Sequence, residues 1–184
     1  MKKLLLFTTI AVLGVTAMNA QVKFGFGLGY AAPLGDIADF TDGGIAGHAE
    51  LGYGITDNID VSLYYQGDFL IGADIQGDTV ASFGNVTLGS FMLNGRYFFK
   101  EDGFRPYGSL GIGITSIGSI DIEGDGQTVS TGESSSNFSF RPAIGFKYKV
   151  LNFNVAYLSG GKSGEASVGN ITANVGLLFT FGGK

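Results

Sequence analysis

Residues 137–150 read NFSFRPAIGFKYKV, and bulky and charged side chains alternate along them. The even positions carry the bulky side chains, at Phe138, Phe140, Ile144, Phe146 and Tyr148. The odd positions carry the charges, at Arg141, Lys147 and Lys149. Successive side chains of a β-strand point to opposite faces, so a period of two predicts a strand with one oily face and one charged face.

The same alternation recurs along the chain and predicts eight strands. They are expected at 22–32, 45–55, 59–69, 85–99, 105–117, 137–150, 152–160 and 168–181. Short connections are expected at 56–58, 100–104 and around Leu151, and long ones at 33–44, 70–84, 118–136 and 161–167. An even strand number with alternating connection lengths is typical of a membrane barrel with short periplasmic turns and long outer loops. We therefore predict an all-β fold, an eight-stranded antiparallel up-and-down transmembrane β-barrel.

The inward face that this alternation predicts holds charges of both signs. They are Glu50, Asp60, Arg96, Arg105, Arg141, Lys147 and Lys149, with Lys23 and Asp68 beside them. Eight strands leave an interior that side chains can fill, so we expect a paired lumen charge network. Two interpretations stay open: the pairs only stiffen the barrel, or they exchange partners along a gated ion path.

Some residues of the predicted strands depart from bulky-out, charged-in alternation. Glycines within 24–30 and 110–114 share the inward face, where they leave room for longer neighbours. Four bulky residues also fall on that face and are expected to pack inside the lumen: Tyr64, Met92, Phe98 and Leu178.

A soluble eight-stranded ligand carrier such as a lipocalin is the alternative fold. Its apolar residues would line a cavity and its charges would face water, so the alternation alone fits both folds. Aromatic residues near both ends of the predicted strands and the alternating loop lengths favour the membrane barrel.

The amino terminus has the features of an export signal. Lys2 and Lys3 precede an apolar run from Leu4 to Ala17, which predicts a signal peptide over 1–20 and a barrel domain over 21–184, with a cut after Ala17 as the alternative to a cut after Ala20. A retained anchor helix is the alternative, but the run is shorter than the roughly 20 residues that a bilayer requires.

Composition excludes several function classes. The chain has 11 basic and 16 acidic residues, a net charge of −5 and no cysteine. The acidic balance argues against nucleic acid as a partner, and thiolate chemistry is impossible. The single histidine, His48, has Glu50 on the same face but no serine motif beside it, so we expect no catalytic site. Residues 121–126 open like a calcium loop, but Glu133 falls one place late, and we expect no metal or other cofactor.

The last predicted strand supplies a more specific signal, because residues 175–181 read VGLLFTF. With the eight-strand pattern, this ending resembles the small eight-stranded outer-membrane β-barrels, a family that includes the transmembrane domain of outer membrane protein A and outer membrane proteins X and W. The resemblance implies that the barrel assembly machinery reads Phe179 and Phe181, although here residues 182–184 follow the aromatic that usually ends the signal.

The same resemblance implies a setting and a role. It implies the outer membrane of a Gram-negative bacterium, with outer-membrane lipids and lipopolysaccharide as surroundings and an unknown extracellular ligand. It also implies a non-catalytic role in envelope integrity or surface recognition or, as in outer membrane protein W, a narrow path for ions or small apolar solutes. No peptidoglycan-binding domain follows the barrel, so a tethering role does not transfer.

Overall fold

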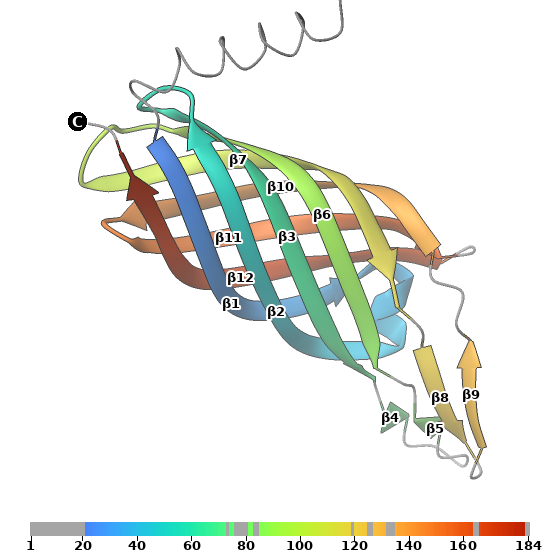
Figure 1. The fold of residues 1–184 in the computed structure, drawn as a ribbon. Coiled ribbons are helices and arrows are strands. Elements are labelled where there is room, and N and C mark those ends of the chain that lie inside the picture. The colour runs from blue at the N-terminus through green and yellow to red at the C-terminus, as the bar shows by residue number, and fades with distance from the viewer. Residues whose placement is uncertain are drawn as a thin grey trace, which may run out of the picture.

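The protein's structure is a computed structural model that describes residues 21–72, 74–75, 81–82, 85–118, 120–124, 127–131, 135–163 and 166–182. Eight long strands form a closed antiparallel barrel in the order β1-β12-β11-β10-β7-β6-β3-β2 (Figure 1). They are β1 (Gln21–Leu34), β2 (Thr41–Gly54), β3 (Ile59–Gly72), β6 (Val86–Phe98), β7 (Phe104–Ile117), β10 (Ser135–Tyr148), β11 (Leu151–Ser163) and β12 (Ala166–Phe181). The predicted fold class is confirmed, and the predicted signal peptide lies outside the described residues.

The two ends of the barrel differ in their connections. At one end, which we call the turn end, strands are joined by short segments at 55–58, 99–103 and 149–150. At the other, the loop end, the 3-10 helix η2 (Gly35–Asp39) joins β1 to β2. The short connections are thus confirmed, whereas the long connection predicted over 33–44 is shorter than expected, because β1 continues to Leu34 and β2 begins at Thr41.

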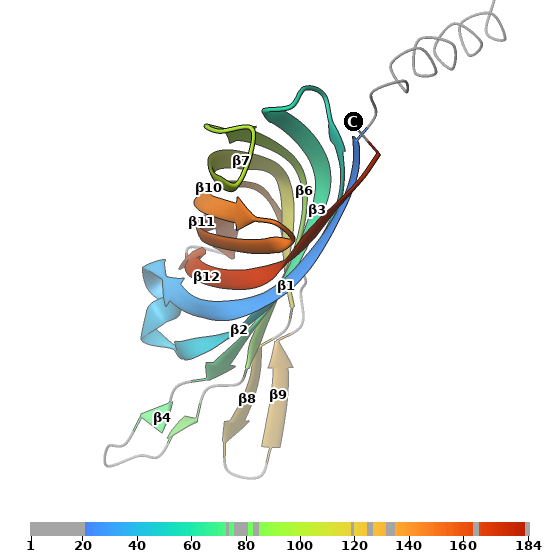
Figure 2. The same cartoon turned by 90° about the vertical axis from the view of Figure 1, so that its left-hand side faces the viewer.

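A second sheet projects past the loop end (Figures 1 and 2). It has the order β4-β5-β8-β9 and is built from β4 (Asp74–Ile75), β5 (Ala81–Ser82), β8 (Ile120–Gly124) and β9 (Gln127–Thr131). We expected only loops over 70–84 and 118–136. These strands escaped the sequence pattern because they are short and mostly polar.

The barrel strands also run farther at the loop end than predicted. β11 continues to Ser163 and β12 begins at Ala166, so the expectation of a long connection over 161–167 was wrong. Ser163 pairs with Ala166, beyond an irregularity between Ser159 and Lys162. Ladder hydrogen bonds join backbone groups and need no apolar side chain, so pairing outlasts the amphipathic pattern.

The predicted faces are confirmed. Large apolar side chains point outward, with Ile144 exposed by 72%, Leu28 by 65% and Val175 by 61%. The four bulky exceptions, Tyr64, Met92, Phe98 and Leu178, are buried in the lumen as expected. Among the described ranges, no helix is long and apolar enough to cross a membrane.

Inward glycines make room for functional side chains. Gly25 pairs with Glu50, and Gly27 pairs with His48, across β1 and β2. A Cβ on Gly25 would lie 2.8 Å from Cγ of Glu50, and one on Gly27 would lie 2.6 Å from Cε1 of His48. Larger residues at these positions would therefore displace the lumen side chains, as the sequence pattern predicted.

Candidate functional site in the barrel lumen

Four charged side chains from four strands meet inside the barrel toward the turn end. We call Lys23, Glu50, Asp60 and Arg96 the ion-pair cluster. Nη2 of Arg96 donates to both carboxylate oxygens of Glu50 at 2.8 Å. Its Nη1 lies 3.7 Å from Oδ2 of Asp60, and Nζ of Lys23 donates to Oδ1 of Asp60.

Strand register and burial explain why this cluster forms. Asp60 on β3 lies directly opposite Arg96 on β6, and the hydroxyl of Ser62 donates to Oε2 of Glu50 at 3.0 Å. All four charged residues are at most 5% exposed. Removing one member of a buried pair leaves an uncompensated charge, which costs about 3–5 kcal/mol. The cluster therefore constrains the lumen strongly.

Aromatic side chains surround the arginine of this cluster. The guanidinium of Arg96 lies 4.9 Å from the ring centroid of Tyr107 and 5.8 Å from that of Phe98. The Tyr107 hydroxyl donates to Oδ1 of Asn152 at 2.9 Å. Phe98 and Tyr107 pack with Leu178 as a small core, so this core and the ion-pair cluster fill the same part of the lumen.

A second polar group lies closer to the loop end, and we call Gln66, Asp68, Arg141, Asn154 and Asn170 the amide network. Nε of Arg141 donates to Oε1 of Gln66 at 2.7 Å, and Nη2 donates to Oδ1 of Asn154 at 3.0 Å. Nε2 of Gln66 donates to both oxygens of Asp68 at 3.0 and 2.9 Å, and Asn170 donates to Oδ2 at 2.8 Å. Gln66 thus links the two charged residues, which form no direct ion pair.

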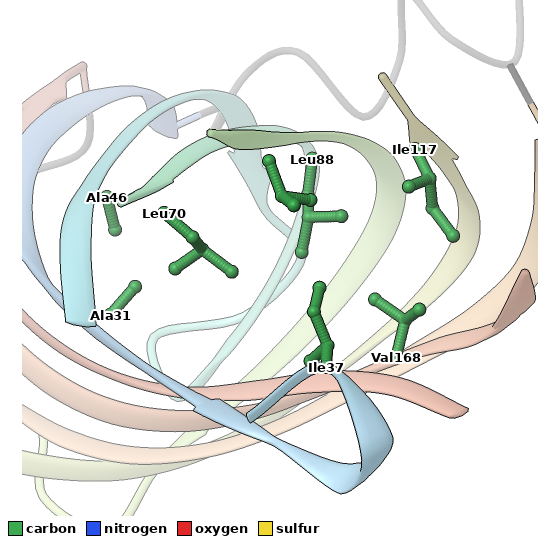
Figure 3. Close-up of a cluster of buried hydrophobic side chains, with 8 residues drawn as sticks. Ala31, Ile37, Ala46, Leu70, Leu88, Ile117 and Val168 are labelled. Carbon is green, nitrogen blue, oxygen red and sulfur yellow. The ribbon is translucent and has the colours of Figure 1, made fainter. Parts of the chain in front are cut away.

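The loop end of the lumen is apolar. Figure 3 shows the side chains of this cluster, which we call the outer plug. Its members are Ala31, Ile37, Ala46, Leu70, Val86, Leu88, Ile117 and Val168. Seven come from barrel strands, while Ile37 comes from η2 and is 6% exposed. The short helix therefore places a side chain over the mouth of the barrel.

Hydrogen bonds hold η2 to β12. Oδ2 of Asp36 accepts from the Ser167 amide at 2.7 Å and from its hydroxyl at 2.9 Å. These bonds, the amide bond first, hold the pKa of the Asp36 carboxyl below its usual value. Gly35, with φ of +78°, turns the chain toward Ser167, and a Cβ there would lie 2.6 Å from the Ser167 hydroxyl oxygen. We call the Asp36–Ser167 contact the η2 latch.

At the turn end the lumen opens into a cavity of about 830 Å³, which we call the turn-end vestibule. Its lining includes Asp57, Glu101, Asp102, Arg105, Lys147 and Thr180. Nζ of Lys147 donates to the Thr180 hydroxyl at 2.7 Å. Arg105 donates to the backbone carbonyls of Lys100, at 3.0 Å, and Asp57, and its guanidinium lies 4.0 Å from the Phe98 ring centroid.

The predicted lumen residues thus separate into groups. Glu50, Asp60 and Arg96 come together, Arg141 lies in the amide network, and Arg105 and Lys147 face the vestibule.

Lys149 differs from the prediction and does not join the network of buried charges. It is exposed, has φ of 54° in the turn after β10, and its Nζ lies 5.8 Å from the Tyr148 ring centroid. The alternation of the strand cannot extend to Lys149, because β10 ends at Tyr148.

The remaining predicted residues also have defined places. Phe179 and Phe181 stack on β12 with ring centroids 6.2 Å apart. The His48 ring stacks on Tyr64, with centroids 5.3 Å apart. Within the described ranges, no three acidic, histidine or cysteine residues could hold a metal ion. Asp125, Gly126 and Glu133 of the calcium-like segment lie outside those ranges.

The predicted lumen charge network did not include the neutral side chains of the lumen or the apolar plug. Buried amides and hydroxyls bond to the charged groups or to one another, at Ser62, Gln66, Asn94, Asn154, Asn170 and Asn174. The alternation places Gln66, Asn94, Asn170 and Asn174 on the inward face, but which charges they contact depends on the register between strands. Ile37 gave no signal, since it lies outside any alternating stretch.

An oily outer surface around a closed barrel with a polar interior defines an integral membrane β-barrel. The chain belongs to the family described as the outer membrane protein beta-barrel domain, whose model matches residues 5–181. The resemblance to small outer-membrane barrels is thereby confirmed, and the protein is a multi-pass barrel of the outer membrane. No curated protein matches this chain.

Solved structures of several outer-membrane barrels share the fold. Ail of Yersinia pestis, in complex with the heparin analogue sucrose octasulfate, is 13% identical with a TM-score of 0.57, over 88% of this chain and 100% of Ail. Neisserial surface protein A is 16% identical with a TM-score of 0.57, over 89% and 97% of the two chains. OprG of Pseudomonas aeruginosa is 14% identical with a TM-score of 0.54, over 89% and 95%. At these identities the likeness concerns the fold alone.

Proposed function

We propose that this protein is a non-catalytic outer-membrane barrel that acts in envelope integrity or surface recognition through its loop end. The observation that carries the proposal is the outer plug, whose eight apolar residues fill the lumen behind η2. The second sheet projects from that same end. In outer-membrane barrels the longer loops are extracellular, so this end is the one that meets lipopolysaccharide headgroups and external partners.

The filled lumen supports this role over transport. A solute would have to pass the ion-pair cluster, the amide network and the outer plug in turn, and each is buried. The wall is also closed, because each long strand pairs with two neighbours. Pairing between β10 and β11 skips Arg141 and Pro142, where proline has no N–H to donate. A side path for a small solute would have to open at that interruption.

The surroundings of the single histidine favour a role without catalysis. His48 is 7% exposed and stacks on Tyr64. A nucleophile and its base need to lie within hydrogen-bond reach. In the described part of the chain, no serine hydroxyl or carboxylate forms a hydrogen bond with His48, and packing is the role that its contacts support.

The charge of the loop end narrows the class of external partner. Asp36, Asp39 and Asp42 are exposed around η2, and Lys162 is the one basic residue in the sequence of the four loop-end connections. Polysulfated ligands, such as the heparin analogue bound by Ail, would meet like charge here. A cationic partner, or lipopolysaccharide phosphates bridged by divalent ions, fits this surface better.

We also propose that residues 1–20 direct export and that the barrel assembly machinery recognises Phe179 and Phe181. β12 carries both aromatics and closes the barrel against β1, with Phe181 opposite Val22. Substituting Phe181 with Ser should lower the amount of assembled barrel in the outer membrane, measured by its resistance to heat-induced unfolding in gels. Unchanged assembly in the double variant F179S/F181S would contradict this role.

Planar-bilayer recording tests whether the lumen is a path. Refolded wild-type barrel, Arg96→Ala and Glu50→Ala should all remain silent, because the outer plug is intact in each. A steady current that either substitution alters would overturn the proposal in favour of a channel.

A second experiment tests the loop end directly. Replacing residues 120–131 by a short turn should leave the barrel folded but reduce the resistance of cells to detergents. The control variant keeps residues 120–131 and carries Asp57→Asn at the turn end, and its cells should resist detergents as the wild type does. Equal resistance in the wild type and the shortened variant would contradict a role for this sheet in envelope integrity.

A further inference from the structure

Buried charge is unbalanced at the turn end of the lumen. Four cationic side chains gather there, while only Glu50 and Asp60 are buried carboxylates. Lys23, Arg96 and Lys147 are buried, and Arg105 is half-buried beside Lys147. Closer to the loop end the count is even, since Arg141 and Asp68 both belong to the amide network. Among the buried groups of the turn end, three cations thus face two carboxylates, and half-buried Arg105 adds further positive charge.

The surplus resides on buried Lys147, with half-buried Arg105 beside it. Both carboxylates of the ion-pair cluster are already engaged by Lys23 and Arg96. In the described part of the chain, neither Arg105 nor Lys147 lies within ion-pair distance of a carboxylate. Lys147 is 6% exposed, and its hydrogen bond is to the neutral hydroxyl of Thr180.

Strand register places these two cations side by side. Arg105 on β7 and Lys147 on β10 are directly opposite partners. Like charges at directly opposite positions destabilise a strand pair, and a buried charge without a counter-charge is costly. An anion between them would remove both penalties.

The turn-end vestibule offers space for that anion. Arg105, Lys147 and Thr180 all line its volume of about 830 Å³, which lies in the range of small-molecule sites, roughly 300–1,000 Å³. Because Thr180 accepts a hydrogen bond from Lys147, its own proton is available to donate to an anion.

The rim of the vestibule restricts what can enter. Asp57, Glu101 and Asp102 also line it and are exposed on the turns, and exposed Lys149 lines it too, so three acidic groups stand against one basic group at the rim. Their net negative charge would repel a long polyanion, whereas a small anion can pass them and reach the cations below. The site therefore suits one oxyanion group on a compact molecule.

We propose that the turn-end vestibule binds a small oxyanion, a phosphate or carboxylate group presented from the periplasmic side, between Lys147 and Arg105. The short turns of outer-membrane barrels are periplasmic, so the ligand comes from the periplasm or from headgroups of the inner leaflet. This site is independent of the loop-end role proposed above.

Inorganic phosphate is the first probe, added to refolded full barrel in zwitterionic micelles at constant ionic strength with chloride as the replaced ion. Equilibrium dialysis should give one saturable site with a roughly millimolar Kd. The urea midpoint should rise with phosphate, because a ligand that binds only the folded state stabilises it.

Lys147→Met should weaken phosphate binding by about tenfold or more. Without phosphate, the same variant should unfold at an equal or higher urea concentration, because its repulsion with Arg105 is gone. If Lys147 instead only stabilised the fold, the variant would unfold at a lower urea concentration than the wild type. Lys100→Met is the matched control, since Lys100 is exposed at the same end but outside the vestibule lining, and it should bind phosphate within about twofold of wild type.

The second arm uses vesicles of phosphatidylcholine with or without phosphatidylglycerol. Stabilisation by phosphatidylglycerol that Lys147→Met abolishes, without binding of free phosphate, would identify a lipid headgroup as the source. If neither probe binds, or if Lys147→Met and Lys100→Met lose binding equally, the proposal is overturned. Should Lys147→Met not fold, Lys147→Gln retains a hydrogen-bonding side chain beside Thr180 and must show the same loss.

Discussion

The two ends of the lumen are enclosed by the same strands, with the same alternation of side chains, but differ in polarity. The turn end has buried charges and an open cavity of about 830 Å³, while the loop end has eight buried apolar residues and a helix across its mouth. Alternation along a strand determines which side chains point inward. It does not determine which part of the lumen along the barrel axis is charged and which part is apolar.

That difference gives the barrel a direction. Water and ions can reach the vestibule from the turn end. There the ion-pair cluster is internally paired, and we propose that Lys147 and Arg105 bind an anion. At the loop end the apolar side chains of the outer plug fill the lumen, and a hydrophobic constriction of this kind blocks conduction by excluding water. If the turn end faces the periplasm, as proposed, the barrel would be open on that side and closed toward the outside.

Breaking the charged end should have the largest effect. Arg96→Ala leaves Glu50 buried without its cation and deprives Asp60 of one neighbour, so it should cost about 3–5 kcal/mol of unfolding free energy. Urea unfolding of the barrel in lipid vesicles measures this. The double variant R96M/E50Q removes both charges and should recover most of the loss. Equal destabilisation by Arg96→Ala and by R96M/E50Q would show that packing rather than charge stabilises the region of the ion-pair cluster.

Removing apolar side-chain volume from the outer plug should cause the next largest loss of unfolding free energy. Leu70 is fully buried in the outer plug, and Leu70→Ala should cost about 2–5 kcal/mol, because a cavity remains where the side chain was. Leu63→Ala is the control on the opposite face of the same strand, 50% exposed outside the barrel, where lipid can fill the space. Similar losses for both variants in vesicle unfolding would contradict a packed plug.

The sequence was sufficient to predict the strands of the barrel and the faces of their side chains. The period of two located all eight strands and assigned residues such as Tyr64 and Leu178 to the lumen, because a misplaced register would turn charges toward lipid at about 2–4 kcal/mol for each Arg or Lys. The bounds were less certain at the loop end. There β11 and β12 continue past the lipid-facing region, where no apolar face is required.

The lumen was only partly predictable. Inward placement of Glu50, Asp60 and Arg96 follows from alternation, but their pairing depends on register between strands distant in sequence, and the bridging role of Gln66 depends on geometry. Lys149 was misplaced because alternation cannot detect the tight turn that begins there. The contribution of Ile37 to the plug arises from a loop that folds back, which no local pattern encodes.

A smaller effect tests the polar packing at the turn end. Tyr107→Phe removes the hydroxyl that donates to buried Asn152, and leaving that acceptor unsatisfied should cost about 1–3 kcal/mol. Tyr97→Phe, on the outward face and 51% exposed, should change the unfolding free energy by less than about 0.5 kcal/mol. Equal values in vesicle unfolding would show that water or other groups satisfy Asn152.

The smallest effect concerns the η2 latch. Hydrogen bonds from Ser167 lower the pKa of the Asp36 carboxyl in the folded protein, so the folded state binds a proton there less readily than the unfolded chain does. The stabilisation is therefore complete above the ordinary aspartate pKa and is lost as the pH falls through the lowered one. Because Asp36 is exposed, only local opening of η2 is expected, not unfolding of the barrel.

Hydrogen exchange of the Ser167 amide measures this opening. Relative to Val168, whose amide is not bonded to Asp36 in the latch, Ser167 should lose protection as the pH drops below the ordinary aspartate range, after correction for intrinsic exchange. Asp36→Asn should show weaker protection with no such pH dependence, since an amide oxygen accepts hydrogen bonds without titrating. If protection in the wild type stays constant at low pH, Asp36 does not hold η2, and the seal at the loop end depends on burial of Ile37 alone.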